Sequence, residues 1–249
     1  MIKNPTSDEL FEAAVHCGHK VGKLHPRMNP YIHTIKNNLH LVDLEKTKEC
    51  LEKAFDFIKE VVAKNGKILF VGTKPIAQAI VKKYAQEVEM PYIVERWLGG
   101  TLTNFSIINK LVRRLKKMEE EKIAGDWEKY TKKEKLDLEK EIEKLNRCVG
   151  GIRDLEKLPE AIFLIDTGEE KTALREAKRT KVKIIGLVDV NCDPTKVDFP
   201  IPGNDDASKS IELITSFIVE VIKEGKKIKL NKQQEAKPKT SPSIQPSKT

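Results

Sequence analysis

Glycines next to a basic residue can cradle a phosphate, and two segments of the sequence have this composition. RWLGGTLTNF (96–105) and FVGTK (70–74) both lie at the end of an apolar run. Neither has the Gly-x-x-x-x-Gly-Lys-Ser/Thr spacing of a P-loop, and no Gly-x-Gly-x-x-Gly follows an expected strand. We therefore keep a nucleotide-dependent α/β enzyme only as the alternative function. We expect Gly99 and Gly100 to turn the chain from a strand into a helix.

The residue types of nucleophilic catalysis are present, but their arrangement is not. The sequence has no Gly-x-Ser-x-Gly nucleophile elbow, and all five histidines lie at or before His40, outside the expected strands of the sheet. Zinc is another use of this cluster, because His16, Cys17 and His19 are close in sequence. No further pair completes a four-ligand set, so we favour hydrogen bonds to a partner or to RNA for these side chains.

Acidic side chains follow two of the expected strands, in DVNCDP (189–194) and IPGNDD (201–206). Ligands of α/β sheets bind beyond the carboxyl ends of the strands, and several hard oxygen atoms suit a divalent cation. The candidate ligands of a structural cation, Mg or Zn, are Asp189, Asp205 and Asp206, with Asn191 and Asp193 beside them. The alternative is that Asp205 or Asp206 only caps the next helix. No cofactor is required in either case.

The elements that would position these residues alternate between short apolar strands and amphipathic helices. Strands are expected at KILFVG (67–72), PYIVER (91–96), AIFLID (161–166), KIIGLVD (183–189) and DFPIP (198–202). Helices are expected after Pro75, near 169–180 and at 206–224. Short apolar strands that alternate with helices indicate a parallel sheet covered by helices on both faces.

The N-terminal part does not follow this alternation. A helix is expected at 6–17, and the segment 16–31 is expected to be irregular because two glycines and two prolines interrupt it. Two short extended runs then flank Asn37-Asn38, a predicted hairpin turn. Asp43 is expected to cap a long helix that Gly66 ends.

Residues 103–149 interrupt the alternation with two long charged helices. Each has a narrow apolar stripe, at Phe105, Ile108, Leu111, Val112, Leu115 and Met118 in the first and at Leu136, Ile142, Leu145 and Val149 in the second. Narrow stripes with dense Lys/Glu faces are typical of an antiparallel coiled coil, here one that projects from the sheet. Thr103 would cap the first helix, and Trp97 would either pack at the joint or face RNA.

Charge is distributed unevenly along the chain. The net charge is +8, but residues 151–222 carry 10 basic and 14 acidic side chains, whereas residues 223–249 carry 8 and 2. A protein that coats DNA uniformly would not have this pattern, although local contact with a polyanion fits it. From residue 226 the sequence is rich in Lys, Pro and Ser, so we expect a disordered basic tail.

Signals for export or membrane insertion are not found in the sequence. The first twenty residues lack a basic start followed by an apolar run, and no apolar stretch approaches the roughly 20 residues of a membrane span. The four cysteines are scattered without a Cys-x-x-Cys pair, so we expect reduced thiols. We therefore expect a cytoplasmic protein that has no membrane contact.

Seven motifs, in this order and at these spacings, resemble the bacterial small-subunit ribosomal protein S2 family. They are AAVHCGHKVGKLHPRMNPYI, NLHLVDLEKT, KILFVGTK, ERWLGGTLTNF, KLNRCVGGIRDLEKLPEAIFLID, IIGLVDVNCDP and VDFPIPGNDDA. The resemblance covers roughly residues 8–225. One departure is Cys17, where the family usually has an aromatic residue.

The resemblance implies a flavodoxin-like three-layer α/β/α fold with a five-stranded parallel sheet, plus a protruding antiparallel coiled-coil hairpin. The domains would be 1–102 and 150–225 for the α/β domain with its irregular N-terminal extension, 103–149 for the inserted hairpin and 226–249 for the disordered tail. A family member would be a non-enzymatic structural constituent of the small (30S) ribosomal subunit. It would bind 16S ribosomal RNA at the head–body junction and help to recruit ribosomal protein S1 for translation.

Folded RNA is recognised through phosphates, 2′-hydroxyls and unstacked bases, which require cations, hydrogen-bonding groups and aromatic rings. The segment 16–31 supplies such groups, and a basic stripe lies on the first hairpin helix. The predicted RNA-binding residues are His16, His19, Lys20, Lys23, His25, Arg27, Asn29, Tyr31, Lys74, Arg96, Trp97, Arg113, Arg114, Lys116 and Lys117. The acidic segment 151–222 would repel RNA, so we expect it to face a basic protein surface, such as part of S1.

Overall fold

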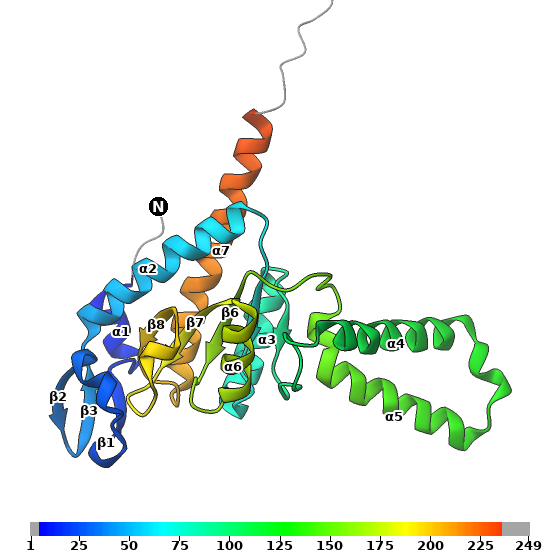
Figure 1. Ribbon diagram of the computed structural model, residues 1–249, viewed down its shortest axis with the longest axis horizontal. Coiled ribbons are helices and arrows are strands. Elements are labelled where there is room, and N and C mark those ends of the chain that lie inside the picture. Colours follow the sequence, from blue (N-terminus) through cyan, green and yellow to red (C-terminus); the bar gives the residue numbers. More distant parts are fainter. Residues whose placement is uncertain (1–4, 236–249) are drawn as a thin grey trace, which may run out of the picture.

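The computed structural model describes residues 5–235 and is organised around a five-stranded sheet (Figure 1). The strands are β4 (Ile68–Val71), β5 (Tyr92–Ile93), β6 (Ala161–Ile165), β7 (Lys183–Val188) and β8 (Phe199–Pro202). They pair in the order β5-β4-β6-β7-β8, and every pair is parallel. Numbered along the chain within this sheet, the order is 2-1-3-4-5, which is the flavodoxin-like order. The predicted α/β class and the five-stranded parallel sheet are therefore confirmed.

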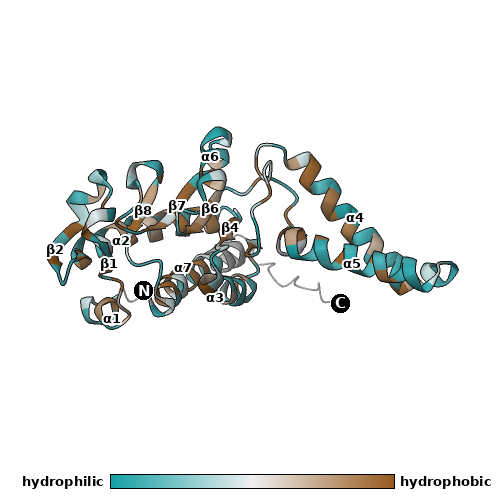
Figure 2. Ribbon diagram, turned by 90° about the horizontal axis from the view of Figure 1, so that it is seen from below, coloured by the Kyte–Doolittle hydropathy of each residue, from teal (hydrophilic) through white to brown (hydrophobic). Residues whose placement is uncertain are grey.

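Helices cover both faces of this sheet. They are α2 (Leu44–Ala63), α3 (Pro75–Glu87), α6 (Lys171–Thr180) and α7 (Ser208–Glu235). Because successive strand residues point to opposite faces, Phe70 and Phe163 pack in a cluster with α2, α3 and α7, whereas Leu69 and Leu164 pack in a second cluster with α6. Figure 2 shows the hydrophobic strands between α6 on one side and α3 and α7 on the other. Both faces are thus used for packing, and the strand ends and edges remain for ligands.

The N-terminal part forms a second, antiparallel sheet at one end of the molecule (Figure 1). Its elements are α1 (Ser7–Glu12), β1 (Cys17–Lys20), η1 (Val21–Lys23), η2 (Pro26–Tyr31), β2 (Ile32–Lys36) and β3 (Leu39–Val42). Asn37 and Asn38 both have a positive φ, as a two-residue hairpin turn requires, so that prediction is confirmed. The helix predicted at 6–17 is shorter, because Ala14 turns the chain with a positive φ.

The prediction of an irregular segment at 16–31 is wrong for residues 17–20, since β1 pairs with β3. Gly18 does not break this strand; it allows a close approach, because a Cβ there would lie 3.0 Å from the carbonyl oxygen of His40. The remainder consists of two 3-10 helices. Short 3-10 helices tolerate Pro26 and Pro30 because few of their N–H groups have partners within the helix. The segment therefore has a defined shape over the strand ends of the main sheet.

Helix α2 begins as predicted, with the Asp43 carboxylate accepting backbone N–H groups of its first turn. It ends at Ala63, and Asn65 rather than Gly66 takes the left-handed conformation, with φ at 63°. Gly66 has a different reason to be glycine, because a Cβ there would lie 2.9 Å from the carbonyl oxygen of Val61. Gly66 still closes the helix, because its N–H donates to the carbonyl oxygen of Val61 at 2.9 Å, so the prediction holds for the helix end but not for the left-handed residue.

Helices α4 (Phe105–Ala124) and α5 (Lys132–Val149) run side by side away from the sheet (Figure 1). The buried residues of α4 are, as predicted, Ile108, Val112, Leu115 and Met118. Two details of the prediction are wrong. Leu136 of α5 is 51% exposed and does not belong to the packed stripe. Thr103 does not cap α4, which begins after Asn104; it hydrogen-bonds to Glu176 instead.

Helix α7 continues to Glu235, beyond the expected domain boundary at residue 225. Residues 236–249 of the predicted tail lie outside the described residues. In the part of the chain that is described, no helix has the length and apolar character needed to cross a membrane.

Candidate nucleic-acid interface

Four strand ends meet at the carboxyl edge of the main sheet and carry charged residues, among them Lys74, Asp205 and Asp206, which were candidates from the sequence. The Nζ of Lys74 lies 3.4 Å from Oδ2 of Asp166, 2.9 Å from Oδ1 of Asp205 and 2.5 Å from Oδ1 of Asp206. Burial opposes the charge on Lys74, but hydrogen bonds to Asp206 and Asp205 outweigh it and raise the pKa of Lys74 above its usual value. The ammonium group of Lys74 is therefore already paired with carboxylates of the protein itself.

Asp205 is a buried carboxylate of this edge in which one oxygen pairs with Lys74 and the other, Oδ2, has no hydrogen-bond partner within residues 5–235. Its side chain is only 2% exposed. Burial, together with repulsion from Asp166 and Asp189, raises the pKa of Asp205 to about 7, although Lys74 opposes the shift. A cleft of about 480 Å³ opens beside it, and its walls include His19, Lys23, Glu169 and Asn191.

His19 connects the N-terminal sheet to the same edge. Its Nδ1 lies 2.9 Å from Oδ2 of Asp189, and its Nε2 lies 3.3 Å from Oδ2 of Asp206. Potential ligand atoms of these three residues lie within 4.8 Å of one another, which is the one such group found in the described chain. This set shares Asp189 and Asp206 with the predicted cation ligands, but His19 stands in place of Asp205, which contacts Lys74.

The predicted RNA-binding side chains of segment 16–31 fall into two groups. His16 stacks on Phe11 with ring centroids 4.3 Å apart, and burial lowers the pKa of His16, so it offers no extra cation. Arg27 donates to Oδ2 of Asp193 at 3.1 Å, which also takes Asp193 away from the candidate cation ligands. Lys20, Lys23 and Asn29 are exposed without such a contact, Arg27 is exposed although it pairs with Asp193, and His25 and Tyr31 are half-buried. His16 is therefore packed within the protein, whereas Lys20, Lys23 and Asn29 are exposed to solvent.

The four cations predicted on the hairpin all lie exposed on α4, at the other end of the molecule from the N-terminal sheet (Figure 1). Arg114 lies 2.5 Å from Glu141 of α5, Lys116 lies 3.5 Å from Asp154, and Lys117 lies 3.7 Å from Glu121. Arg113 has no ion-pair partner in the part of the chain that the structure describes. The structure therefore does not bring the two predicted groups of RNA ligands together.

Trp97 and the two glycines after it form the joint between β5 and the hairpin. The Trp97 side chain packs in the second cluster, and its indole Nε1 donates to Glu176 of α6 at 3.1 Å. The same carboxylate accepts the backbone N–H groups of Gly100 at 2.7 Å and Leu102 at 3.0 Å. Gly100 has a φ of +93°, so it supplies the turn expected of this segment. Of the two roles expected for Trp97, this geometry is that of joint packing; Arg96 beside it is exposed.

Sequence reasoning missed Glu176, although α6 carried a usable signal. The residue lies next to Ala177 on a helix face whose other members, Ala173 and Leu174, are buried. A carboxylate on such a face must find donors or lose its charge. Burial alone would raise the pKa of Glu176, but hydrogen bonds from Gly100 and its neighbours keep this pKa below its usual value.

The P-loop-like segment FVGTK contacts a carboxylate where a nucleotide phosphate would be required. Oε1 of Glu170 accepts the Thr73 hydroxyl at 2.6 Å and the Thr73 backbone N–H at 3.3 Å. Burial raises the pKa of Glu170. The loop donors are therefore already used, which agrees with the missing P-loop spacing.

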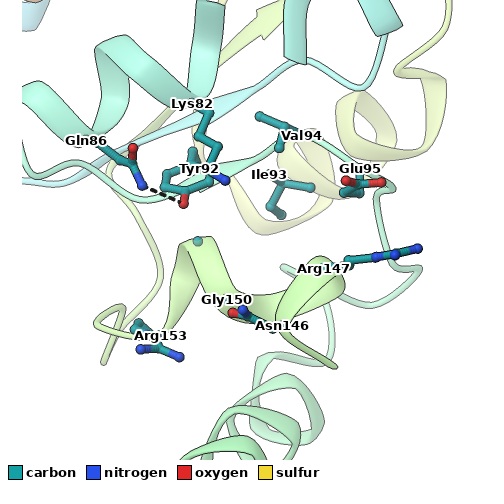
Figure 3. A pocket seen from close by; sticks show the side chains of 11 residues that line it. Lys82, Gln86, Tyr92, Ile93, Val94, Glu95, Asn146, Arg147, Gly150 and Arg153 are labelled. Carbon is teal, nitrogen blue, oxygen red and sulfur yellow. Dashed lines mark hydrogen bonds between the residues drawn. The ribbon is translucent and has the colours of Figure 1, made fainter. Parts of the chain in front are cut away.

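A second cleft, of about 410 Å³, lies at the base of the hairpin (Figure 3). Its lining side chains include Lys82 and Gln86 of α3, Tyr92 and Glu95 near β5, and Arg147 and Arg153 near the end of α5. No sequence pattern predicted this cleft, because its two walls come from helices that are far apart in the chain.

Comparison with known proteins gives a consistent result. The family model described as Ribosomal protein S2 matches residues 10–225. A relative from Mycobacterium leprae, "Small ribosomal subunit protein uS2", is 45% identical over 224 residues, which is 90% of this chain and 81% of the relative. Proteins of the same description from Mycobacteroides abscessus and Mycolicibacterium vanbaalenii are 45% and 44% identical over 220 residues, 88% of this chain and 79% and 81% of theirs.

Proposed function

The chain belongs to the ribosomal protein S2 family of structural, non-enzymatic small-subunit proteins, and on this premise we propose that it binds 16S ribosomal RNA at the head–body junction and helps to recruit ribosomal protein S1. The observation that carries the RNA contact is the exposure of cations at two separate places. These are Lys20 and Lys23 beside the carboxyl edge and the stripe Arg113, Arg114, Lys116 and Lys117 on α4. Exposed cations that lack strong partners can neutralise phosphates without first breaking a buried network.

Small subunits stripped of this protein provide the test. The full chain should co-sediment with them in a one-to-one ratio after a high-salt wash. In a variant with Arg113, Arg114, Lys116 and Lys117 changed to Gln, the binding constant should depend less steeply on salt. The slope of log binding constant against log salt concentration should be smaller in magnitude by about 3, since each lost phosphate contact removes about 0.7 to 0.9. If wild-type protein washes off completely, or shows saturable nucleotide turnover instead, the ribosomal function is wrong.

The acidic side of the molecule is our proposed contact for a basic surface of S1. Asp189 and Asp205 of this side are buried, so they cannot present charge to a partner. Glu169 and Asp206 are the exposed carboxylates of this edge. Changing both to neutral amides should weaken S1 capture by the subunit, whereas unchanged capture would remove this part of the proposal.

We further propose that the protein requires no cofactor but that His19, Asp189 and Asp206 can hold a divalent cation. An imidazole nitrogen among the ligands favours Zn over Mg. Equilibrium dialysis with Zn²⁺ alone should give one bound ion for wild type and none for His19→Ala, with Mg²⁺ as the comparison. Equal Zn²⁺ binding by the two proteins would exclude these ligands.

For the hairpin, we propose that residues 103–149 form an inserted antiparallel coiled coil and that residues 1–102 and 150–225 make up the α/β domain. Support comes from the exposed, charged outer faces of α4 and α5 and from their single buried stripe. Replacing residues 106–148 with a short Gly-Ser linker should leave the α/β domain folded. A cooperative loss of all structure would show that the hairpin is part of the core.

A further inference from the structure

The cleft at the base of the hairpin, here named the joint cleft, gathers cations from separate parts of the chain (Figure 3). Lys82 comes from α3, Arg147 from the last turn of α5, and Arg153 follows η4 (Gly150–Ile152). One carboxylate, Glu95, lies in the same lining. The cleft therefore has an excess of positive charge in a concave site, which raises the local concentration of anions.

These cations are available to an external ligand, unlike Lys74. Lys82 is exposed and has no ion-pair partner among the described residues. Arg147 pairs with Glu143 at 2.7 Å, but both side chains are more than half exposed, at 62% and 65%, so the pair is weak. Arg153 donates only Nη2 to Glu119, at 3.1 Å to each carboxylate oxygen. The rest of its guanidinium group can still donate.

The charges continue out of the cleft along α5. Lys140, Lys144 and Arg147 are spaced i, i+4 and i+7, which places them on one face of the helix, and all three are exposed. Two carboxylates lie beside this row, since Lys140 is 3.9 Å from Asp137 and Arg147 pairs with Glu143, but both are exposed pairs that exchange easily. Four helical residues span about 6 Å, so this row presents a charge at each turn of the helix and ends in the joint cleft. An extended row suits a polymer with repeated negative charge better than it suits a single small anion.

The walls of the joint cleft also fit a nucleic acid. Tyr92 offers an aromatic ring, and its hydroxyl accepts Nε2 of Gln86 at 3.1 Å, which holds both groups at the wall (Figure 3). Gly151 packs directly against Tyr92 and has no room for a side chain, because a Cβ there would lie 2.2 Å from the carbonyl oxygen of Tyr92 and 2.7 Å from its ring. RNA carries one phosphate per nucleotide together with bases and ribose that use such rings and hydrogen-bonding groups.

We infer that the joint cleft binds the sugar–phosphate backbone of an RNA strand that runs along α5, with Lys82, Arg147 and Arg153 on the phosphates and Tyr92 against a base or ribose. This inference rests on the proposed ribosomal function and adds a contact that the sequence did not predict. Because the cleft lies between the sheet and the hairpin, bound RNA would contact both parts at once. The strand would therefore also fix the angle of the hairpin.

The test uses the full chain and small subunits stripped of this protein, with binding measured over a range of KCl concentrations. The variant Lys82→Ala/Arg147→Ala should bind about tenfold more weakly. The slope of its log binding constant against log salt concentration should fall in magnitude by about 1.5, because two phosphate contacts are lost. The matched control is Lys83→Ala/Lys64→Ala. Lys83 is the neighbour of Lys82 but faces Glu212, and Lys64 forms an exposed i,i+4 pair with Glu60, as Arg147 does with Glu143.

The inference is supported if the control variant matches wild type in affinity and salt dependence while the cleft variant loses affinity. If wild type binds but the cleft variant matches it, the joint cleft is not an RNA site, and the proposed function survives. An equal loss in the control also overturns the inference, since any two surface lysines would then suffice. Failure of wild type to bind the subunit is a different result and would overturn the proposed function itself.

Discussion

The carboxyl edge of the sheet and the α4–α5 hairpin are both densely charged, but they use charge in opposite ways. At the edge, Lys74 lies within hydrogen-bonding distance of two carboxylates, one of them 2% exposed. On the hairpin, Arg114 and Glu141 are 60% and 35% exposed, and each faces water. The edge is thus an internal ionic network, whereas the hairpin presents charge to the outside.

This difference determines which lysine and arginine side chains can bind an external phosphate. A buried ion pair is strongly coupled because water does not screen it, and removing one partner leaves an uncompensated charge. An exposed pair contributes little and can exchange its partner for a phosphate at small cost. The position of a lysine in the sequence does not distinguish the two cases; the burial of its partners does.

The largest expected effect is on stability at the edge. Lys74→Met leaves Asp166 and Asp205 buried without their cation and should lower the free energy of unfolding by about 3 kcal/mol at pH 7. The loss stays near the low end of the range for broken buried pairs, because Asp205, with its pKa of about 7, can take up a proton. Urea unfolding measures it, with Arg114→Met as the control, which should change stability by less than about 0.5 kcal/mol. Equal losses in the two variants would abolish the distinction between the regions.

The joint combines features of both regions, since the carboxylate of Glu176 is buried at the base of the exposed hairpin. Glu176→Ala leaves the N–H groups of Gly100 and Leu102 without their acceptor and should cost about 2 kcal/mol. The fluorescence of Trp97, whose indole loses the same partner, should shift to longer wavelength in a Trp127→Phe background. An unchanged spectrum and stability would mean that the carboxylate does not hold the joint.

The sequence predicted the framework better than it predicted the site. Apolar runs such as AIFLID are confirmed as strands because burial on both faces leaves a continuous pattern. Asn37-Asn38 is confirmed because its turn depends on local backbone conformation alone. The contacts of Lys74 and Arg27 could not be predicted, since their partners Asp205 and Asp193 are far away in the chain. The donors of Glu176 lie 73 to 79 residues away in the chain, so the local sequence did not reveal them.

Acidification should change the stability contributions of the two buried glutamates of this region in opposite directions. Hydrogen bonds, opposing burial, lower the pKa of Glu176 from 4.5, so its ionised form stabilises the fold above pH 4.5, and this contribution is lost as the pH falls through the folded-state pKa. Burial raises the pKa of Glu170 above 4.5, so its stability contribution has the opposite sign and improves on acidification.

The variants Glu176→Gln and Glu170→Gln test this pair. At pH 7, Glu176→Gln should be less stable than wild type by about 1 kcal/mol, and the difference should shrink below pH 4.5. Glu170→Gln should be neutral or stabilising at pH 7, and that advantage should shrink as wild-type Glu170 becomes protonated. Unfolding by urea at a series of pH values gives both profiles. Parallel profiles would show that the hydrogen bonds to Glu176 do not offset its burial.

The smallest expected effect is the coupling energy of an ion pair on the hairpin surface, which can be compared directly with that of a buried pair at the edge. A double-mutant cycle between Arg114 and Glu141 should give a coupling of about 0.5 kcal/mol in low salt, falling toward zero in 1 M KCl, where the Debye length is about 3 Å. The corresponding cycle between Lys74 and Asp205 should give a larger coupling that changes little with salt, because Asp205 is almost completely removed from solvent. A salt-sensitive coupling at both places would mean that the edge is open to water and that Lys74 can exchange partners as a surface lysine does. Lys74 would then return to the set of cations that an RNA phosphate could reach.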